Sequence, residues 1–506
     1  MSLLAIDMGS SSCKAVAFSV DGPVLSYKTH AYKPESPQPG WAEMHPEKFW
    51  DAFRSVVRDV AAEAYEPIEV LAISSHGETF IPVDSRGRAV GNAILNLDQR
   101  AVAQTRWLTD NIGRERIFQI TGLPIHTMYP LPKILWLREN QPGTFVVTDC
   151  FLALPTYLLS RLGLPRYVDY SLASRYLAFD IHQRRWSDEI LSKCGLDSKV
   201  LPEPVPAGTI AGELNPSIAS DLGLAANTRV AVGGHDQPCA ALGCGVVNPG
   251  RVSASLGTYE CLVAASETPA VNDQALAANL NSYCHVVSNR FVNLVFFPAG
   301  VMLEWFAGLL QAGSHSADSS AKLFVELEAS TQPGPTRLLI TPHLPGTCNP
   351  DFDPHASGVI VGIRPGTSAS DLYKAILEGI ACEFAAMTSF LQKAVGPFSD
   401  VYVTGGGTRS RLGLNLRASL ANVRLHLMQS DEAVCLGTAM LAGVGSGKYR
   451  NLDEAIEQLV VTRETISPTP ACAASYQKQL DQYRLLYSCL APIRTAQEMS
   501  SQGEFS

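Results

Sequence analysis

Residues 3–20, LLAIDMGSSSCKAVAFSV, decide the fold class of this chain. An apolar run of β-forming residues ends at Asp7, a turn of glycine and serine follows, and a second apolar run begins at Ala15 after Lys14. Small residues at 9–12 let backbone N–H groups and hydroxyls converge on an anion. Lys14 can add a positive charge, and Asp7 can hold water on a divalent metal. The stretch predicts either a site for the terminal phosphates of a nucleotide or an ordinary β-hairpin with a serine-rich turn.

The size and composition of the chain limit the classes of protein it can be. A length of 506 residues is too long for one hydrophobic core and predicts two or three domains. The formal net charge of −9 argues against nucleic acid or an anionic membrane as a partner. The 12 cysteines lack metal-type spacing, and we find no apolar run of membrane-spanning length and no signal-peptide pattern. These features predict a cytoplasmic protein.

Two halves of the chain begin with a similar pattern. The second half repeats the opening arrangement with a strand at 252–256, a turn at Gly257 and Thr258, and a strand at 259–264. This echo predicts two related α/β domains that face one ligand across a cleft. The predicted division is a first domain at residues 1–249, a second domain at 250–450 and a helical extension at 451–506.

Asp236 is the strongest candidate for catalysis. It follows an apolar strand at 229–233 and lies next to glycines that allow a ligand to approach the backbone. A carboxylate at this place can accept a proton from a substrate hydroxyl, a role worth roughly 10²–10⁴ in rate. Asp is also a favoured N-cap, so Asp236 can instead begin the helix from Gln237 onward. The spacing alone favours neither role.

Glycine-containing turns provide further candidate ligand contacts. Gly257 and Thr258 follow a strand and can offer a backbone N–H group and a hydroxyl to a phosphate. Gly405, Gly406 and Gly407 lie between a predicted strand and a predicted helix. Their lack of side chains leaves room for a flat or bulky group against the backbone, although a flexible loop is the alternative.

A polar set follows the strands of the first half. Carboxylates and an arginine can bind vicinal hydroxyls through charge-assisted hydrogen bonds. Each of these residues alone is more often a surface residue or part of a structural salt bridge, so their role depends on the fold bringing them beside Asp236. The set consists of His76, Glu78, Asp98 and Arg100.

Together these motifs resemble those of the FGGY carbohydrate kinases, which include glycerol kinase and xylulokinase. The resemblance extends from residue 3 to about residue 448 and implies two actin-like (ribonuclease H-like) ATPase domains with a cleft between them. The matching motifs are DMGSSSCK (7–14), MYPLPKILWLREN (128–140), GHDQ (234–237), SLGT (255–258), AGVMLEW (299–305), DLYKAILEGIA (371–381) and VTGGGTRS (403–410).

The resemblance implies ATP and Mg²⁺ as cofactors and the transfer of the γ-phosphoryl group to a sugar or polyol hydroxyl. Asp236 takes the position of the catalytic base, and Asp7 that of the metal site. The implied sugar contacts are His76, Glu78, Asp98, Arg100 and Asp236. The implied ATP contacts are Gly9, Ser10, Ser11, Ser12, Lys14, Gly257, Thr258, Gly300, Gly405, Gly406 and Gly407. A homodimer is also consistent with the family.

The sequence leaves the substrate open. Residues 76–79, His-Gly-Glu-Thr, replace the Gln-Met-His-Gly of xylulokinases and share Glu-Thr with glycerol kinases, but Gly77 stands where glycerol kinases have Arg. Residues 97–100, Leu-Asp-Gln-Arg, resemble the Asp-x-Arg segment of xylulokinases. We therefore expect a small ketose, with a glycerol- or tetritol-type polyol as the alternative. A sugar-responsive regulator and an ATPase acting on proteins are the rival classes.

Overall fold

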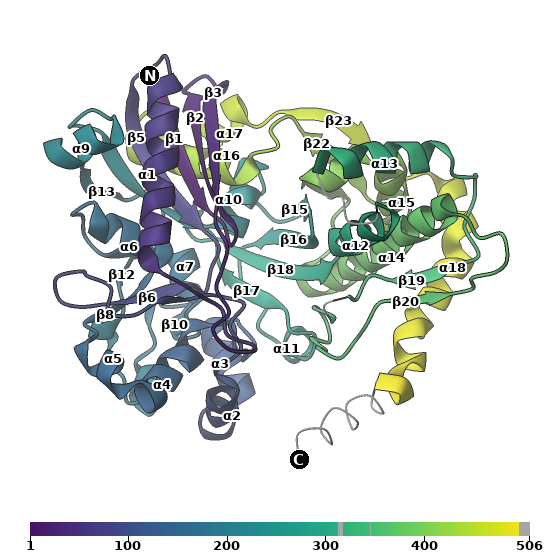
Figure 1. Cartoon of the computed structure of the whole chain (residues 1–506), viewed down its shortest axis with the longest axis horizontal. Coiled ribbons are helices and arrows are strands. Elements are labelled where there is room, and N and C mark those ends of the chain that lie inside the picture. The colour runs from purple at the N-terminus through teal and green to yellow at the C-terminus, as the bar shows by residue number, and fades with distance from the viewer. Residues whose placement is uncertain (312–316, 345, 495–506) are drawn as a thin grey trace.

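The computed structural model describes residues 1–311, 317–344 and 346–494, and it is built on two large sheets (Figure 1). The first sheet has six strands in the order β13-β14-β5-β1-β2-β3. β1 is antiparallel to β2 and parallel to β5, which is in turn parallel to β14. The strands are β1 (Ser2–Met8), β2 (Ser12–Ser19), β3 (Val24–Ala31), β5 (Ile68–Ser75), β13 (Ile210–Glu213) and β14 (Arg229–His235).

The continuous apolar character of β1 is explained by helices on both faces of the sheet. Leu4 and Ile6 belong to a buried cluster with apolar residues of α1 (Pro46–Glu63). Leu3 and Ala5 point to the other face and join residues of α16 (Ala433–Gly445). The opening strand is therefore a core strand of the molecule.

The second sheet has seven strands in the order β17-β18-β16-β15-β21-β22-β23. Its long helix α14 (Ala369–Val395) begins with a capping box formed by Ser368 and Asp371 and packs on the sheet through a continuous apolar face. The strands are β15 (Arg251–Leu256), β16 (Tyr259–Ser266), β17 (Asn281–Cys284), β18 (Phe291–Pro298), β21 (Asp400–Thr404), β22 (Arg424–Met428) and β23 (Thr462–Ile466).

Smaller elements complete the two halves. The helices are α2 (Val102–Asn111), α3 (Arg114–Thr121), α4 (Pro130–Asn140), α5 (Pro142–Val147), α6 (Leu154–Arg161), α7 (Tyr170–Ser174), α8 (Asp188–Lys193), α9 (Pro216–Leu222), α10 (Asp236–Gly243), α11 (Asp273–Ala277), α12 (Gly300–Leu310), α13 (Ala317–Ala329), α15 (Arg411–Ala421), α17 (Leu452–Leu459) and α18 (Pro470–Cys489). The short strands are β4 (Glu43–Met44), β6 (Phe80–Val83), β7 (Ala93–Ile94), β8 (Cys150–Ala153), β9 (Tyr167–Asp169), β10 (Phe179–Asp180), β11 (Arg185–Trp186), β12 (Glu203–Val205), β19 (Leu339–Thr341) and β20 (Val359–Val361).

The helices α10 and α16 join the two halves of the chain. Their backbones touch where a Cβ on Gly243 would lie 2.0 Å from the carbonyl oxygen of Ala433. A Cβ on Gly437 would lie equally close, 2.0 Å, to the carbonyl oxygen of Cys239. Helix α16 thus comes from the predicted second domain but covers the sheet of the first. The crossing fixes α10, which carries Asp236, against both halves.

The prediction of a purely helical segment from residue 451 onward is wrong at 462–466. These residues form β23, which pairs antiparallel with β22 at the edge of the second sheet (Figure 1). Only Ile466 of this strand is buried, so its own sequence shows no alternating pattern and pairing with β22 explains the strand. Residues 495–506 of the predicted extension lie outside the described residues. Of the helices that the structure describes, none is both long and apolar enough to cross a membrane.

Candidate active site

Asp236 begins helix α10 directly after strand β14, and the carboxyl group lies in a crowded polar setting. His235 is the N-cap residue, and its Nε2 lies 3.2 Å from Asp236 Oδ1. Within the described ranges this Oδ1 is buried and accepts no hydrogen bond. A buried carboxylate oxygen without a partner is costly unless a ligand supplies a donor. The geometry therefore marks Asp236 as a ligand-facing group, and His235 takes the capping position.

The environment of Asp236 makes its carboxylate a stronger base. Burial raises the pKa of Asp236 well above its usual value, and the nearby carboxyls of Asp7 and Glu78 raise it further. The N–H of Gln237 and the guanidinium of Arg175 oppose this shift. A carboxylate with a raised pKa takes a hydroxyl proton more readily than an ordinary surface carboxylate.

Asp7 lies at the end of β1 and is also perturbed. Burial raises its pKa to about 6, although Lys14 and a hydrogen bond from Ser74 act in the other direction. Ser74 Oγ donates to Asp7 Oδ1 at 3.3 Å. Among the described residues there is no cluster of three or more metal-binding side chains. One carboxylate with water and substrate phosphates is a common way of holding Mg²⁺, so the residues present fit this ion.

The turn that links β1 and β2 is closed by its own backbone. Gly9 N–H donates to the Ser12 carbonyl at 2.9 Å, and Tyr32 donates its hydroxyl to the Gly9 carbonyl at 2.5 Å. The hydroxyls of Ser10, Ser11 and Ser12 donate to no other residue in the part of the chain that the structure describes. The turn thus leaves its serine hydroxyls without a protein partner among the described residues, and binding of an anion there stays a prediction. Lys14, by contrast, is bound to Glu432.

A large cavity of about 1170 Å³ lies in the second half of the molecule. Its walls include Gly257, Thr258, Gly300, Gly406 and Gly407, and its volume is sufficient for a nucleoside. A Cβ on Gly300 would lie 2.5 Å from the Gly257 carbonyl oxygen, so this glycine lets α12 approach the turn. These predicted ATP contacts therefore share one cavity.

Gly405 differs from the two glycines that follow it. Its φ is +94°, and a Cβ there would lie 2.7 Å from the Leu256 carbonyl oxygen. It is not part of the cavity wall. We conclude that Gly405 shapes the turn after β21, and direct contact with the nucleoside stays a prediction.

His76 and Glu78 follow strand β5, close to Asp236. Both ring nitrogens of His76 have protein partners, because Nδ1 lies 2.8 Å from the Met8 carbonyl oxygen and Nε2 2.7 Å from Thr79 Oγ1. Burial lowers the pKa of His76, which keeps the ring neutral. Glu78 has a left-handed backbone with φ of 68° and forms a buried ion pair with Arg175. Among the described residues Glu78 Oε2 has no protein partner, whereas both His76 nitrogens do, and contact of either residue with a sugar stays a prediction.

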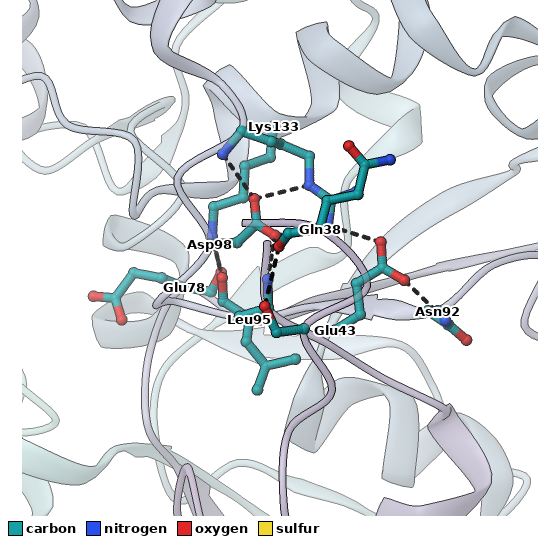
Figure 2. Close-up of polar contacts among 10 residues, drawn as sticks. Gln38, Glu43, Glu78, Asn92, Leu95, Asp98 and Lys133 are labelled. Atoms are coloured by element: carbon teal, nitrogen blue, oxygen red, sulfur yellow. Dashed lines mark hydrogen bonds and ion pairs between the residues drawn. The ribbon is translucent and has the colours of Figure 1, made fainter. Parts of the chain in front are cut away.

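The side chains of Asp98 and Arg100 are already engaged in internal contacts. Their side chains are 0% and 1% exposed and form an ion pair that also includes Glu43. Asp98 accepts the Ala42 N–H at 2.7 Å, and Arg100 stacks 3.7 Å from the Trp41 ring centroid. Figure 2 shows Asp98 and Glu43 of this cluster together with Lys133. Contact of Asp98 or Arg100 with a sugar remains a prediction, and their internal contacts support a structural role.

Sequence reasoning missed residues that complete the site. Arg175 follows α7 and binds Glu78, and Asn281 and Tyr283 of β17 pack beside it. Lys133 donates to the carbonyl oxygens of Leu95 and Glu78. Lys133 lies within the motif at 128–140, which was the one available signal. The others are isolated polar residues whose spacing indicates no function.

Comparison with known proteins identifies the family. A model of the FGGY family of carbohydrate kinases, N-terminal domain, matches residues 2–243, and a model of its C-terminal domain matches residues 252–446. A xylulose kinase from Bacillus subtilis is 26% identical over 498 residues, which cover 98% of each chain. A glycerol kinase from Symbiobacterium thermophilum is 27% identical over 492 residues, covering 94% of this chain and 96% of that protein.

The fold is also shared with solved structures. A ligand-bound xylulose kinase from Lactobacillus acidophilus superimposes with a TM-score of 0.88 at 21% identity and covers 100% of both chains. The predicted family and the predicted actin-like, two-domain fold are confirmed. The chain belongs to the FGGY family of carbohydrate kinases and is an ATP-dependent sugar kinase.

Proposed function

We propose that the chain phosphorylates a small ketose, as xylulokinases do, with Asp236 as the general base. The observation that carries this proposal is the buried Asp236 Oδ1, which has no hydrogen-bond partner among the described residues. A sugar hydroxyl is the donor that such an oxygen lacks. Xylulose kinases among the relatives, such as that of Bacillus subtilis, support a ketose as the acceptor.

The proposed reaction is an in-line transfer of the γ-phosphoryl group from ATP. Asp236 accepts the proton of the attacking hydroxyl as the new O–P bond forms and the bond to ADP breaks. The serine hydroxyls of the turn at 9–12, and its N–H groups other than that of Gly9, stabilise phosphoryl charge, as preorganised donors do. Asp7 would hold Mg²⁺ through water, and the ion, when bound, would neutralise charge on the phosphates.

The nucleotide is proposed to bind in the cavity of the second half. Gly257 and Thr258 lie at its phosphate end because their turn continues from β15, and Gly406 and Gly407 face the nucleoside. Asp236 is close to the strand after this turn, since burial and the Asp236 carboxyl together raise the pKa of Cys261 to about 12. Cys261 pairs with Ser255, two residues before Gly257, and this register supports a proposed base near the phosphate turn.

A polyol kinase of the glycerol or tetritol type is the second candidate. The Glu78-Thr79 pair after β5 favours it, because Glu78 offers a carboxylate to vicinal hydroxyls. ADP release measured with ATP across pentuloses, hexuloses, tetritols and glycerol decides between the two. Preference for a pentulose supports the first candidate, and preference for glycerol or a tetritol overturns it. ATP hydrolysis that does not depend on any sugar contradicts both.

A further inference from the structure

Arg175 occupies the space that Gly77 leaves empty. A Cβ on Gly77 would lie 3.0 Å from Arg175 Cγ and 3.1 Å from His235 Nε2. The Arg175 side chain reaches this place from the end of α7, far from Gly77 in the sequence, and the residue is 3% exposed. The absence of a side chain at residue 77 therefore does not remove positive charge from the sugar side of the site, because Arg175 supplies it.

Every nitrogen of this guanidinium already has an internal acceptor. Nε donates to Glu78 Oε1 at 2.5 Å, and Nη2 forms an ion pair with the same oxygen. Nη1 donates to Asn281 Oδ1 at 2.9 Å, and that oxygen also accepts the Tyr129 hydroxyl at 2.9 Å. The rings of Tyr129 and Tyr283 lie 5.2 and 4.8 Å from the guanidinium carbon. The Arg175 guanidinium is thus held by hydrogen bonds in its plane and by two aromatic rings beside it.

Glu78 is held from two sides. Its carbonyl oxygen accepts from Lys133, and Figure 2 shows its carboxylate extending away from that lysine. The other carboxylate oxygen, Oε2, has no protein partner in residues 1–311, 317–344 and 346–494. The two side-chain atoms left for a ligand here are therefore both carboxylate oxygens, Glu78 Oε2 and Asp236 Oδ1.

The charges around these oxygens disfavour an anionic sugar. Asp7, Glu78 and Asp236 each contribute a carboxyl group, and the first two raise the pKa of Asp236. His76 and His235 stay neutral because burial lowers the pKa of each ring. The positive charge of Arg175 is matched by Glu78, and the Lys133 amino group is held by the carbonyl oxygens of Glu78 and Leu95 with a pKa that burial lowers to about 7. A second anion would meet acceptors and carboxylates without a free guanidinium nitrogen.

We propose that Arg175 determines specificity through Glu78, so that the sugar site selects neutral sugars or polyols and rejects sugar acids. Arg175 acts as a positioning residue that fixes the Glu78 carboxylate as an acceptor for one sugar hydroxyl. Glu78 in turn occupies the guanidinium that would otherwise bind a sugar carboxylate. This inference rests on the proposed sugar kinase function and specifies its substrate class.

The test compares a neutral pentulose with a five-carbon aldonate, here called a pentonate, on the full-length protein. In the wild type we expect the pentonate to be a poor substrate and a poor inhibitor. Glu78→Gln should raise the KM for the pentulose at least tenfold and improve pentonate binding at least tenfold. The double variant Glu78→Gln/Arg175→Met should lose the tenfold improvement in pentonate binding. The KM for ATP should stay within twofold in both variants, which a general structural defect would not allow.

Direct binding of the pentonate is measured by calorimetry, so this arm does not require turnover. Equal pentonate affinity in the wild type and Glu78→Gln, or a gain that persists in the double variant, overturns the inference. A wild type that binds a neutral sugar without phosphorylating it contradicts the proposed function instead. Glu78→Gln leaves a buried guanidinium without a counter-charge, so Glu78→Asp serves if the first variant does not fold. Glu78→Asp keeps the negative charge, so it should raise the KM for the pentulose without improving pentonate binding. An unchanged KM for the pentulose in this variant overturns the proposal.

Discussion

Lys14 Nζ lies 2.5 Å from Glu432 Oε2 and joins residues that are 418 positions apart in the chain. Lys14 follows the proposed phosphate turn, and Glu432 is the N-cap residue of α16. Both side chains are about 30% exposed, since their exposed fractions are 31% and 28%. A phosphate that binds at the turn therefore competes with Glu432 for the ammonium group.

Removal of Glu432 should strengthen ATP binding. In Glu432→Gln the ammonium of Lys14 no longer has its carboxylate partner, so the KM for ATP should fall by about 2- to 5-fold, which corresponds to roughly 0.4–1 kcal/mol for a partly exposed ion pair. Lys14→Met should raise the same KM. Steady-state kinetics at saturating sugar measures both. A higher KM for ATP in Glu432→Gln would show that Glu432 assists the nucleotide.

Asp236→Asn should remove phosphoryl transfer and preserve ATP binding. We expect kcat to fall by roughly 10²–10⁴, because the amide cannot accept the hydroxyl proton. The wild type should also lose kcat/KM on the acid side, since burial raises the pKa of Asp236 and its proton must leave before it acts. Coupled ADP assays and nucleotide titration measure these effects. Undiminished turnover in Asp236→Asn would exclude Asp236 as the base.

Asp7→Asn should abolish activity but stabilise the ligand-free protein above pH 6. The folded-state pKa of Asp7 is about 6 against an ordinary value of 3.8, so the folded state prefers the protonated form. As pH rises from about 4 to about 6, the unfolded chain ionises first and the protein loses stability, up to about 3 kcal/mol at 1.36 kcal/mol per pKa unit. Denaturant unfolding at pH 4 and pH 8 tests this. The free energy of unfolding of Asp7→Asn should exceed that of the wild type by more at pH 8 than at pH 4.

Gly406→Ala should weaken ATP binding without changing the fold. A Cβ on Gly406 meets nothing within 4 Å, yet Gly406 lines the proposed nucleoside cavity. The added methyl group therefore has no protein neighbour to displace and should contact the bound nucleotide, which raises the KM for ATP at least threefold. Gly143→Ala is the matched control, because its Cβ is also unobstructed but lies in α5 of the first half. Equal KM values in both variants would place the nucleoside elsewhere.

Arg100→Met should lower stability far more than sugar affinity. The change leaves the buried Asp98 carboxylate with its charge unpaired and removes the stacking on Trp41. Loss of one partner from a buried pair costs about 3–5 kcal/mol. We expect the KM for sugar of the folded variant to stay within twofold. A large rise in that KM with unchanged unfolding free energy would instead assign Arg100 to the sugar.

The sequence predicted those elements whose structure follows from a few neighbouring residues. The apolar strand 3–6, the small-residue turn after Asp7 and the acidic residue after β14 are each visible because strand burial and turn chemistry act over few residues. The strand at 462–466 was missed, since its exposed residues pair with β22 through backbone hydrogen bonds that carry no side-chain signal. Composition cannot reveal such edge pairing.

By itself the sequence determined the kinase family, the small-residue turn after Asp7 and the position of Asp236 after a buried strand, because these depend on residues close together in the chain. Only the tertiary structure decided which polar groups are free. In the folded chain Asp98 pairs with Arg100, Lys14 pairs with Glu432, and Arg175 pairs with Glu78. Each of the last two pairings joins residues almost a hundred or more positions apart, 418 for Lys14 and 97 for Arg175. Only the packing of distant elements sets their partners, and partners decide whether a charged group meets a ligand or another residue.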